Sequence, residues 1–151
     1  MTPEAMVALA TKHGMSELNR DFETALATMT GSGTYYFYPY RLHITGREPI
    51  FELWSRLFPP GGPIRCFDPS VRLPETRQFT EYINPDSVAH FQSSVFVDEH
   101  GEQIRSNHVT QYHFEGDLMK SETVYLDAVL MRYFDRVFDD SYRALPGVVQ
   151  I

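Results

Sequence analysis

The stretch that most constrains the fold runs from Ser87 to Asp127, where three long strand patterns follow one another with only short turns between them. The strand patterns are Val88–Val97, Gln103–Phe114 and Leu118–Asp127, and the turns are Asp98-Glu99-His100-Gly101 and Glu115-Gly116-Asp117. Runs rich in β-branched and aromatic residues, bounded by Gly and Asp, are typical of strands joined by hairpin turns. The stretch therefore predicts a meander of three antiparallel strands.

One face of this meander is unusually polar in its middle. Side chains alternate along a strand, so a register that sets Phe96 opposite Ile104 and Phe114 opposite Leu118 places the even-numbered residues on one face. The middle of this face carries His90, Gln92, Ser94, Ser106, His108, Thr110 and Glu122. Burying a polar group without a partner costs about 1–3 kcal/mol, which a packed core avoids. We interpret the middle of the face as the wall of a pocket for a small-molecule ligand.

Size and charge exclude several classes of protein. With 151 residues the chain fits one domain, spanning 1–151, and the formal charge of −7 would repel a phosphate backbone. We therefore expect no nucleic-acid partner. No apolar run reaches the roughly 20 residues of a membrane span, and the N-terminus lacks the pattern of a signal peptide, so we expect no membrane partner and a cytoplasmic location. The single Cys66 excludes an intramolecular disulfide and reads as a small, half-buried hydrophobic residue.

Helix signals surround the meander. Thr2-Pro3-Glu4 predicts a helix start, Gly14 its end, and Ser16 the cap of a second helix. Gly46 opens another helix, and Asp127 caps a last amphipathic one. Between them, Thr34–Leu42 has the composition of a strand but contains Pro39, which predicts an edge or bulged strand. Asp68–Glu75, with two prolines, predicts a loop over the mouth of the pocket. The order of elements indicates the α+β class, with helices on one face of a curved sheet.

Three motifs resemble the nuclear transport factor 2-like superfamily, also called the SnoaL-like or ketosteroid isomerase-like fold. The motifs are Asp21-Phe22-Glu23 followed by Tyr35-Tyr36-Phe37-Tyr38-Pro39, then Gly46-Arg47-Glu48-Pro49-Ile50, and last Phe114-Glu115-Gly116-Asp117-Leu118-Met119 followed by Val124-Tyr125-Leu126-Asp127. The resemblance implies a cone-shaped, curved antiparallel sheet wrapped by N-terminal helices around an internal pocket, plus a C-terminal helix.

The chemistry of known members is not carried over with the fold. Ketosteroid isomerases have an Asp-Pro general base where this chain has Tyr38-Pro39, and their acidic oxyanion donor falls near Thr110. The Asp-Arg-Asp set of limonene epoxide hydrolases aligns with His108, Thr110 and Val124. Polyketide cyclases place an Asp at the position of Val124. Scytalone dehydratases, which use histidines and tyrosines, are the nearest in kind.

His108 and Glu122 are the sharpest catalytic candidates, since the assumed register sets Glu122 opposite Thr110 and diagonal to His108. A carboxylate that orients an imidazole holds it basic, as proton transfer requires. A purely structural hydrogen bond between the two is the other interpretation. Tyr38 joins them as the third catalytic candidate.

The expected substrate-binding residues are His90, Gln92, Thr110, Tyr112 and Trp54. For Trp54 a plain core position is the competing interpretation. The histidines lack the close spacing of a metal site, so we expect no metal and no cofactor.

The function that follows is an isomerase, dehydratase or cyclase that uses general acid–base chemistry on an apolar, oxygenated small molecule. The alternative is a non-catalytic domain for small-molecule binding or assembly. The odd-numbered face of the meander mixes apolar side chains such as Phe91, Val95 and Val109 with polar ones. A half-apolar outer sheet face is commonly buried against a second copy, so we expect a homodimer.

Overall fold

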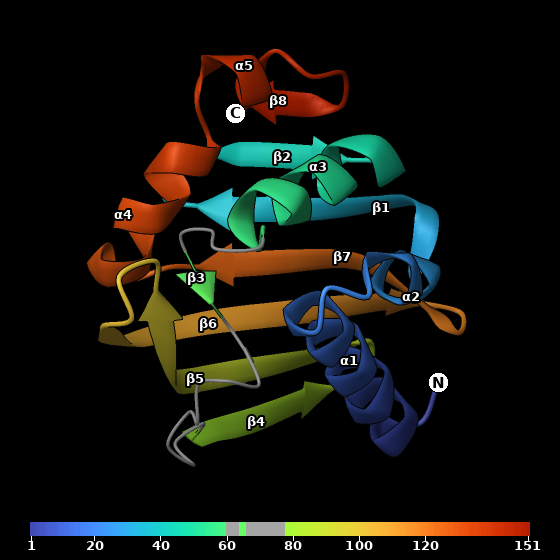
Figure 1. Cartoon of the computed structure of the whole chain (residues 1–151). Coiled ribbons are helices and arrows are strands. Elements are labelled where there is room, and N and C mark those ends of the chain that lie inside the picture. Colours follow the sequence, from blue (N-terminus) through green and yellow to red (C-terminus); the bar gives the residue numbers. More distant parts are fainter. Residues whose placement is uncertain (60–63, 66–77) are drawn as a thin grey trace.

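The computed structural model describes residues 1–59, 64–65 and 78–151, which form five helices and one eight-stranded sheet (Figure 1). Cys66 and the predicted loop Asp68–Glu75 lie outside the described residues. The helices are α1 (Pro3–Leu18), α2 (Phe22–Ala27), α3 (Arg47–Leu57), α4 (Ala128–Val137) and α5 (Asp140–Arg143). The strands are β1 (Met29–Tyr38), β2 (Leu42–Thr45), β3 (Ile64–Arg65), β4 (Gln78–Asn84), β5 (Ser87–Asp98), β6 (Gln103–Glu115), β7 (Leu118–Tyr125) and β8 (Val148–Gln150).

The sheet is mixed, with the strand order β3-β5-β6-β7-β1-β2-β8 and with β4 also paired to β5. The predicted α+β class is confirmed, and β5, β6 and β7 form the predicted antiparallel meander. The expectation of a wholly antiparallel sheet is wrong, because β1 runs parallel to β7. The first and last thirds of the chain therefore meet in the middle of the sheet.

Of the two alternatives predicted for this strand, an edge strand or a bulged strand, the structure shows the second. β1 lies between β7 and β2, and the sheet tolerates Pro39 because the strand ends at Tyr38, one residue earlier. The expected irregularity is present, since the pairing of β1 with β7 shifts between Met29 and Thr34. The short C-terminal strand β8 pairs with β2 and forms the edge on this side.

Helix α1 is continuous through Gly14, so the predicted break there and the predicted cap at Ser16 are wrong. A glycine inside a helix costs only about 0.5–1 kcal/mol relative to alanine, and packing against the sheet overrides that cost. Asp21, not Ser16, caps the following helix α2. The cap at Thr2, the helix after Gly46 and the cap at Asp127 are confirmed. The continuity of α1 matters because it fixes two residues of the site described below.

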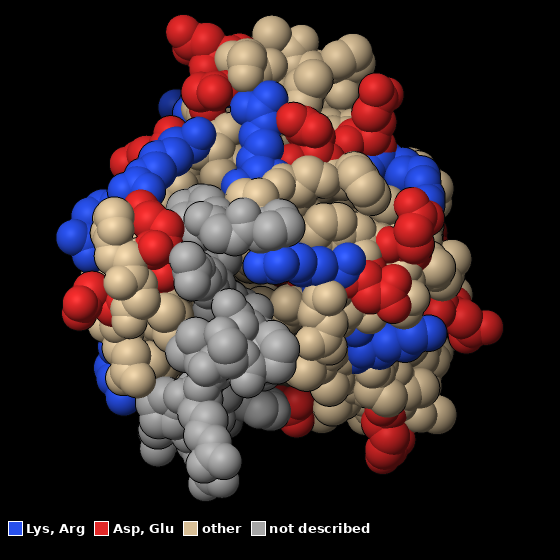
Figure 2. All heavy atoms as spheres, viewed as in Figure 1, with Lys and Arg blue, Asp and Glu red and all other residues tan. Residues whose placement is uncertain are grey.

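Helices α1, α2 and α3 lie over the same face of the sheet, and α4 packs at the end where β7 stops (Figure 1). The core between these layers is rich in aromatic side chains, among them Tyr35, Phe37, Trp54, Phe134 and Phe138. Lys and Arg side chains are interspersed with Asp and Glu on the face seen in Figure 2. No described helix is long and apolar enough to cross a membrane. The cytoplasmic location stays a prediction.

Candidate functional site

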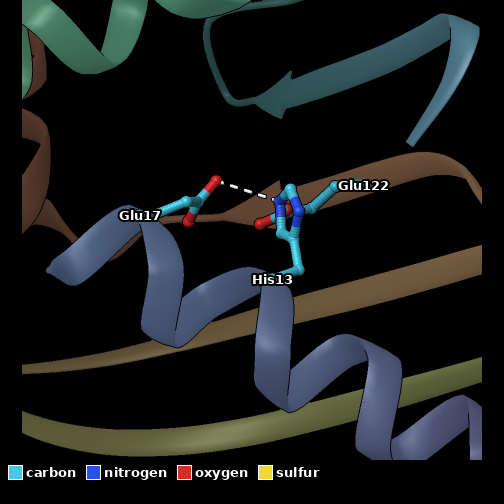
Figure 3. A group of neighbouring side chains, drawn as sticks. All are labelled: His13, Glu17 and Glu122. Carbon is cyan, nitrogen blue, oxygen red and sulfur yellow. Dashed lines mark ion pairs between the residues drawn. The ribbon is translucent and has the colours of Figure 1, made fainter. Parts of the chain in front are cut away.

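A buried histidine on α1 points at the sheet and meets carboxylates from two elements. His13 and Glu17 are one helical turn apart and share a face of α1, while Glu122 projects from β7 behind them (Figure 3). Nε2 of His13 lies 3.1 Å from Oε1 of Glu17 and 3.2 Å from Oε2 of Glu122. The hydroxyl of Tyr35 on β1 lies 2.6 Å from the same nitrogen. We call these four residues the His13 cluster.

The other ring nitrogen of His13 is also occupied. Nδ1 lies 2.6 Å from Oγ1 of Thr28, and that hydroxyl donates its own hydrogen to the carbonyl of Ala25. Because the Thr28 hydrogen is already used, its oxygen accepts a hydrogen bond from Nδ1–H. Nε2 faces only oxygen atoms, so it too carries a proton, and the ring is an imidazolium.

The charge of His13 is set by two opposing effects. Complete burial lowers its pKa, but the carboxylates of Glu17 and Glu122 outweigh burial and raise the pKa of His13 to about 10. Burial and the negative charge of Glu17 raise the pKa of Glu122, while His13 opposes that rise. Burial, with Glu122 and Glu17 next, also raises the pKa of Tyr35 well above its usual value. The pKa values of His13, Glu122 and Tyr35 are therefore all raised, which favours the protonated form of each group.

Glu122 is the member with an unused acceptor. Its Oε2 is buried and receives no directed hydrogen bond from the residues that the structure describes, although Nε2 of His13 is only 3.2 Å away. The N–H of Nε2 is aimed instead at the Tyr35 hydroxyl, which in turn donates to Oε1 of Glu17. Glu122 thus has an oxygen that can exchange a proton with a neighbouring group.

A metal ion fits this cluster poorly. The ligand atoms of His13, Glu17 and Glu122 do lie within 4.8 Å of one another. An ion on Nε2 would sit about 2.0–2.1 Å away along the direction of the nitrogen lone pair. The Tyr35 hydroxyl occupies that direction at 2.6 Å. The donor set as folded suits a shared proton, and the absence of a metal stays a prediction.

The predicted register of β5 and β6 is confirmed, so the expected substrate-binding residues of these strands share the inner face. His90, Gln92, Thr110 and Tyr112 are all buried there. Gln92 donates to the hydroxyl of Thr110 over 3.4 Å. Nε2 of His90 lies 3.2 Å from Oε1 of Glu81 on the neighbouring strand β4. The rings of His13 and His90 both pack edge-on against the ring of Tyr112, which connects this row to the His13 cluster.

The predicted register of β6 and β7 is wrong. Glu122 pairs with Tyr112 rather than Thr110 for two reasons. Leu118 pairs with Glu115 instead of Phe114 at the turn, and the pairing shifts by one more residue between His113 and Phe114. His108 is four residues from Tyr112, which is about 13 Å along a strand at roughly 3.3 Å per residue. It pairs with Gln92 and its ring packs near Phe96. The structure therefore brings His13, and not His108, to Glu122.

Tyr38 and Trp54 lie on opposite sides of the sheet. Tyr38 is 37% exposed on the outer face, where its ring stacks on Tyr125. Its side chain does not reach Glu122, and Tyr35 fills the corresponding inner position. Trp54 on α3 is buried in the core, with its ring 5.9 Å from that of His13 and 6.1 Å from that of Tyr35.

Sequence reasoning missed His13, Glu17 and Tyr35. The signal for the first two was the spacing of four residues between a histidine and a glutamate on the face of α1 that also carries Met6 and Ala10. The assumed break at Gly14 separated the two residues into different helices and hid this signal. For Tyr35, the signal was its alternation with Phe37, another core residue, along β1.

A groove of about 600 Å³ lies on the outer face of the sheet. Its lining comes mainly from odd-numbered residues of β5, β6 and β7, such as Phe91, Asn107, Val109 and Tyr125. Its lining also includes Gln92 and His108, which the alternation pattern assigned to the internal pocket between the sheet and the helices. That internal pocket stays a prediction.

Comparisons with known proteins identify the fold and leave the activity open. No protein-family model and no curated protein matches the sequence. By contrast, 225 chains of solved structures match. An NTF2-like protein from Burkholderia xenovorans LB400 has a TM-score of 0.66 at 13% identity, covering 88% of this chain and 98% of that chain.

Two other solved structures show the range of proteins that share this architecture. A protein from Catenulispora acidiphila with a ketosteroid isomerase-like fold, in complex with trimethylamine, has a TM-score of 0.63 at 18% identity and covers 89% of this chain and 95% of its own. A SnoaL-like polyketide cyclase candidate from Shewanella denitrificans has a TM-score of 0.67 at 11% identity, covering 89% and 99%. At such identities the likeness concerns the backbone alone.

Proposed function

We propose that this chain, which has the nuclear transport factor 2-like fold, is a small enzyme that moves protons on an apolar, oxygen-bearing small molecule. The observation that carries the proposal is the environment of Glu122. It is a buried carboxyl group on the inner sheet face, its pKa is raised, and Nε2 of His13 lies 3.2 Å from its Oε2. A carboxyl group whose pKa moves toward neutrality is suited to act as a general base and then as a general acid.

The residues around Glu122 supply the other parts of such a site. The imidazolium of His13 stabilises the carboxylate form of Glu122 when it waits as a base. Polar groups of His90, Gln92 and Thr110 on the same sheet face would position or polarise an oxygen of the substrate. Tyr112 stands between the two groups of side chains. In this assignment Tyr35 takes the role predicted for Tyr38, and His13 takes the role predicted for His108.

The reaction class is isomerisation, dehydration or cyclisation without a cofactor. Many reactions of these classes begin with removal of a proton from a carbon next to a carbonyl group, which one positioned carboxylate can accomplish. The trimethylamine complex and the cyclase candidate support binding or conversion of small molecules on this fold. They do not specify a substrate for this chain.

The test is deuterium incorporation from D₂O next to the carbonyl of a panel of hydrophobic ketones, read by mass spectrometry. We expect the parent to label at least one ketone and Glu122→Gln to label it about 10²–10⁴-fold more slowly, the usual contribution of a general base. Glu115→Gln removes an exposed carboxylate of β6 and serves as the control. A folded Glu122→Gln variant that labels as fast as the parent refutes the proposal. Binding of the ketones without labelling would favour the non-catalytic alternative.

We also propose that the protein works as a homodimer formed through the outer sheet face. Aromatic side chains stand exposed there in two contacting pairs, Tyr82 with Phe91 and Tyr38 with Tyr125. The groove described above is lined by one member of each pair, Phe91 and Tyr125. Exposed aromatic surface of this kind supports burial against a second copy of the chain.

A further inference from the structure

The members of the His13 cluster differ in their access to water. The side chain of His13 is completely buried, and that of Glu122 is only 7% exposed, with Oε2 fully covered. Glu17 is the most accessible of the charged members, at 14%, and lies in the last turn of α1. A proton held by His13 therefore has no direct contact with solvent, whereas one held by Glu17 does.

Hydrogen bonds connect the buried end of the cluster to this accessible end. Nε2–H of His13 donates to the hydroxyl oxygen of Tyr35 over 2.6 Å, and the Tyr35 hydroxyl donates to Oε1 of Glu17. Both bonds point in the same direction, from the core toward the surface. A hydroxyl that accepts one hydrogen bond and donates another can relay a proton: its oxygen takes up the incoming proton while its own proton moves to the acceptor.

The opposite side of the ring offers no such route. Nδ1–H of His13 donates to Thr28, which is 1% exposed, and Thr28 donates to the carbonyl of Ala25. A backbone carbonyl oxygen has no hydrogen to hand on, so this path ends there. Nε2 of His13 also lies 3.1 Å from Oε1 of Glu17. Among the described residues, however, the directed hydrogen bonds that lead outward from Nε2 run through Tyr35.

We propose that Tyr35 and Glu17 form a proton relay that exchanges protons between the buried pair of His13 and Glu122 and the solvent. In the outward direction His13 gives its Nε2 proton to Tyr35, which gives its own to Glu17, and Glu17 releases one to water. Glu122 then passes a proton from Oε2 to the vacated Nε2 of His13 across 3.2 Å. Only N–H and O–H bonds break and form, and one proton leaves Glu122 for each one that reaches water.

The use of this relay in turnover rests on the proposed function, whereas the relay itself does not need a substrate. If Glu122 takes a proton from a substrate, the relay lets solvent hydrogen replace it before it is returned. The inference therefore favours reactions in which the product acquires hydrogen from water over reactions that return the same hydrogen to another carbon. Tyr35 and Glu17 are positioning residues in this scheme, because they act through His13.

The experiment measures how fast the Nε2 hydrogen of His13 exchanges with water, by NMR saturation transfer on the full chain labelled with ¹⁵N-histidine. The chain has six histidines, so His13→Gln identifies the signal. We expect Tyr35→Phe and Glu17→Gln each to slow the exchange at least tenfold. Loosened packing would have the opposite effect, since local opening speeds exchange. The readout therefore separates a relay from a structural role.

Two variants serve as matched controls. Tyr142→Phe removes another buried hydroxyl, which donates to the carbonyl of Pro49. Glu23→Gln removes an exposed carboxylate that pairs with Arg47. Both should leave the exchange rate unchanged. Equal or faster exchange in Glu17→Gln, whose partly exposed side chain makes it the milder change, overturns the relay even if Tyr35→Phe fails to fold. The two proposals can fail separately. If Tyr35→Phe and Glu17→Gln do not slow the exchange at His13 but Glu122→Gln still abolishes deuterium incorporation into the ketones, the relay is refuted and the proposed function is not.

Discussion

Oε2 of Glu122 on β7 lies 3.2 Å from Nε2 of His13 on α1, so an ion pair joins the first helix to the middle of the sheet. Both side chains are buried. Removing one partner of a buried pair leaves an uncompensated charge, which typically costs about 3–5 kcal/mol. This contact therefore governs stability as well as the proposed chemistry, and it makes both depend on pH.

We expect stability to fall as the pH rises from about 6.5 to 10. His13 faces Glu17, Glu122 and Tyr35, and its folded pKa is about 10 against an ordinary value of 6.5. Its contribution is therefore complete below pH 6.5 and lost as the pH passes through 10. The raised pKa of Glu122 has the same sign, but its effect on stability begins already near its ordinary value of 4.5. Urea unfolding at pH 6, 8 and 10 should show a loss on the order of a few kcal/mol.

The control for this pH dependence is His13→Gln, which should unfold with a much flatter profile over the same range. The raised pKa of Tyr35 affects stability only above pH 10, outside the window. Identical slopes for the parent and His13→Gln would contradict the charge state assigned to the cluster.

Asp127 is expected to be the most costly helix cap to remove. One carboxylate oxygen accepts hydrogen bonds from the backbone of Val129 and Leu130 and from the hydroxyl of Ser106, and the other accepts from the backbone of Asn107. Asp127→Ala therefore removes the hydrogen bonds that connect the start of α4 to β6, and it should lower the free energy of unfolding by about 2 kcal/mol. Thr2→Ala, which removes the exposed cap of α1, should cost about 1 kcal/mol or less. Equal losses in denaturant titrations would argue against the bridging role.

Gly147→Ala should detach the C-terminal strand. Gly147 has φ of +88°, and an added Cβ would lie 2.3 Å from the carbonyl oxygen of Thr45. The change should cost about 2 kcal/mol or more and should speed amide exchange at Thr45, whose N–H donates to Gly147. Gly31→Ala is the control, because nothing lies within 4 Å of its Cβ position. Protected exchange at Thr45 in Gly147→Ala would contradict the strain.

Light scattering at micromolar concentration should give a mass of about 35 kDa, twice the 17.5 kDa of the chain. Phe91→Glu places a charge on the outer sheet face and should return the mass to that of one chain. Phe51→Glu, at a similarly exposed phenylalanine on α3, should leave the dimer intact. A parent that scatters as a single chain would refute the assembly proposal.

The sequence was sufficient for the hairpin of β5 and β6 because a short turn fixes the pairing on both sides. It was insufficient for β6 and β7, since the shift between His113 and Phe114 leaves no trace in a pattern of period two. This shift adds to a one-residue difference at the turn, where Leu118 pairs with Glu115 instead of Phe114, and together they move the expected partner of Glu122 from Thr110 to Tyr112. A face can thus be predicted from alternation, whereas the neighbour of one side chain depends on local irregularity.

Helix α1 illustrates a second limit. Local propensity marked Gly14 as a break, and only the packing of α1 on the sheet shows that the helix continues to Leu18. The partner of Glu122 lay on the helix that this break cut short. Long-range contacts of this kind decide the site, and they are what a single sequence conveys least.

The parallel pairing of β1 with β7 sets the order of events during synthesis. Tyr35 and Glu122 are register partners, yet most of the chain separates them. Contacts between such distant segments raise the contact order. The chain loses entropy when it closes the long loop between them, and this loss comes before the strand pairing contributes any stabilisation. When β1 leaves the ribosome, its β2 neighbour follows within a few residues, but its other edge stays open until β7 is translated. The nascent chain therefore carries an unpaired strand edge through most of its synthesis, the state in which strand pairing with other chains is most probable.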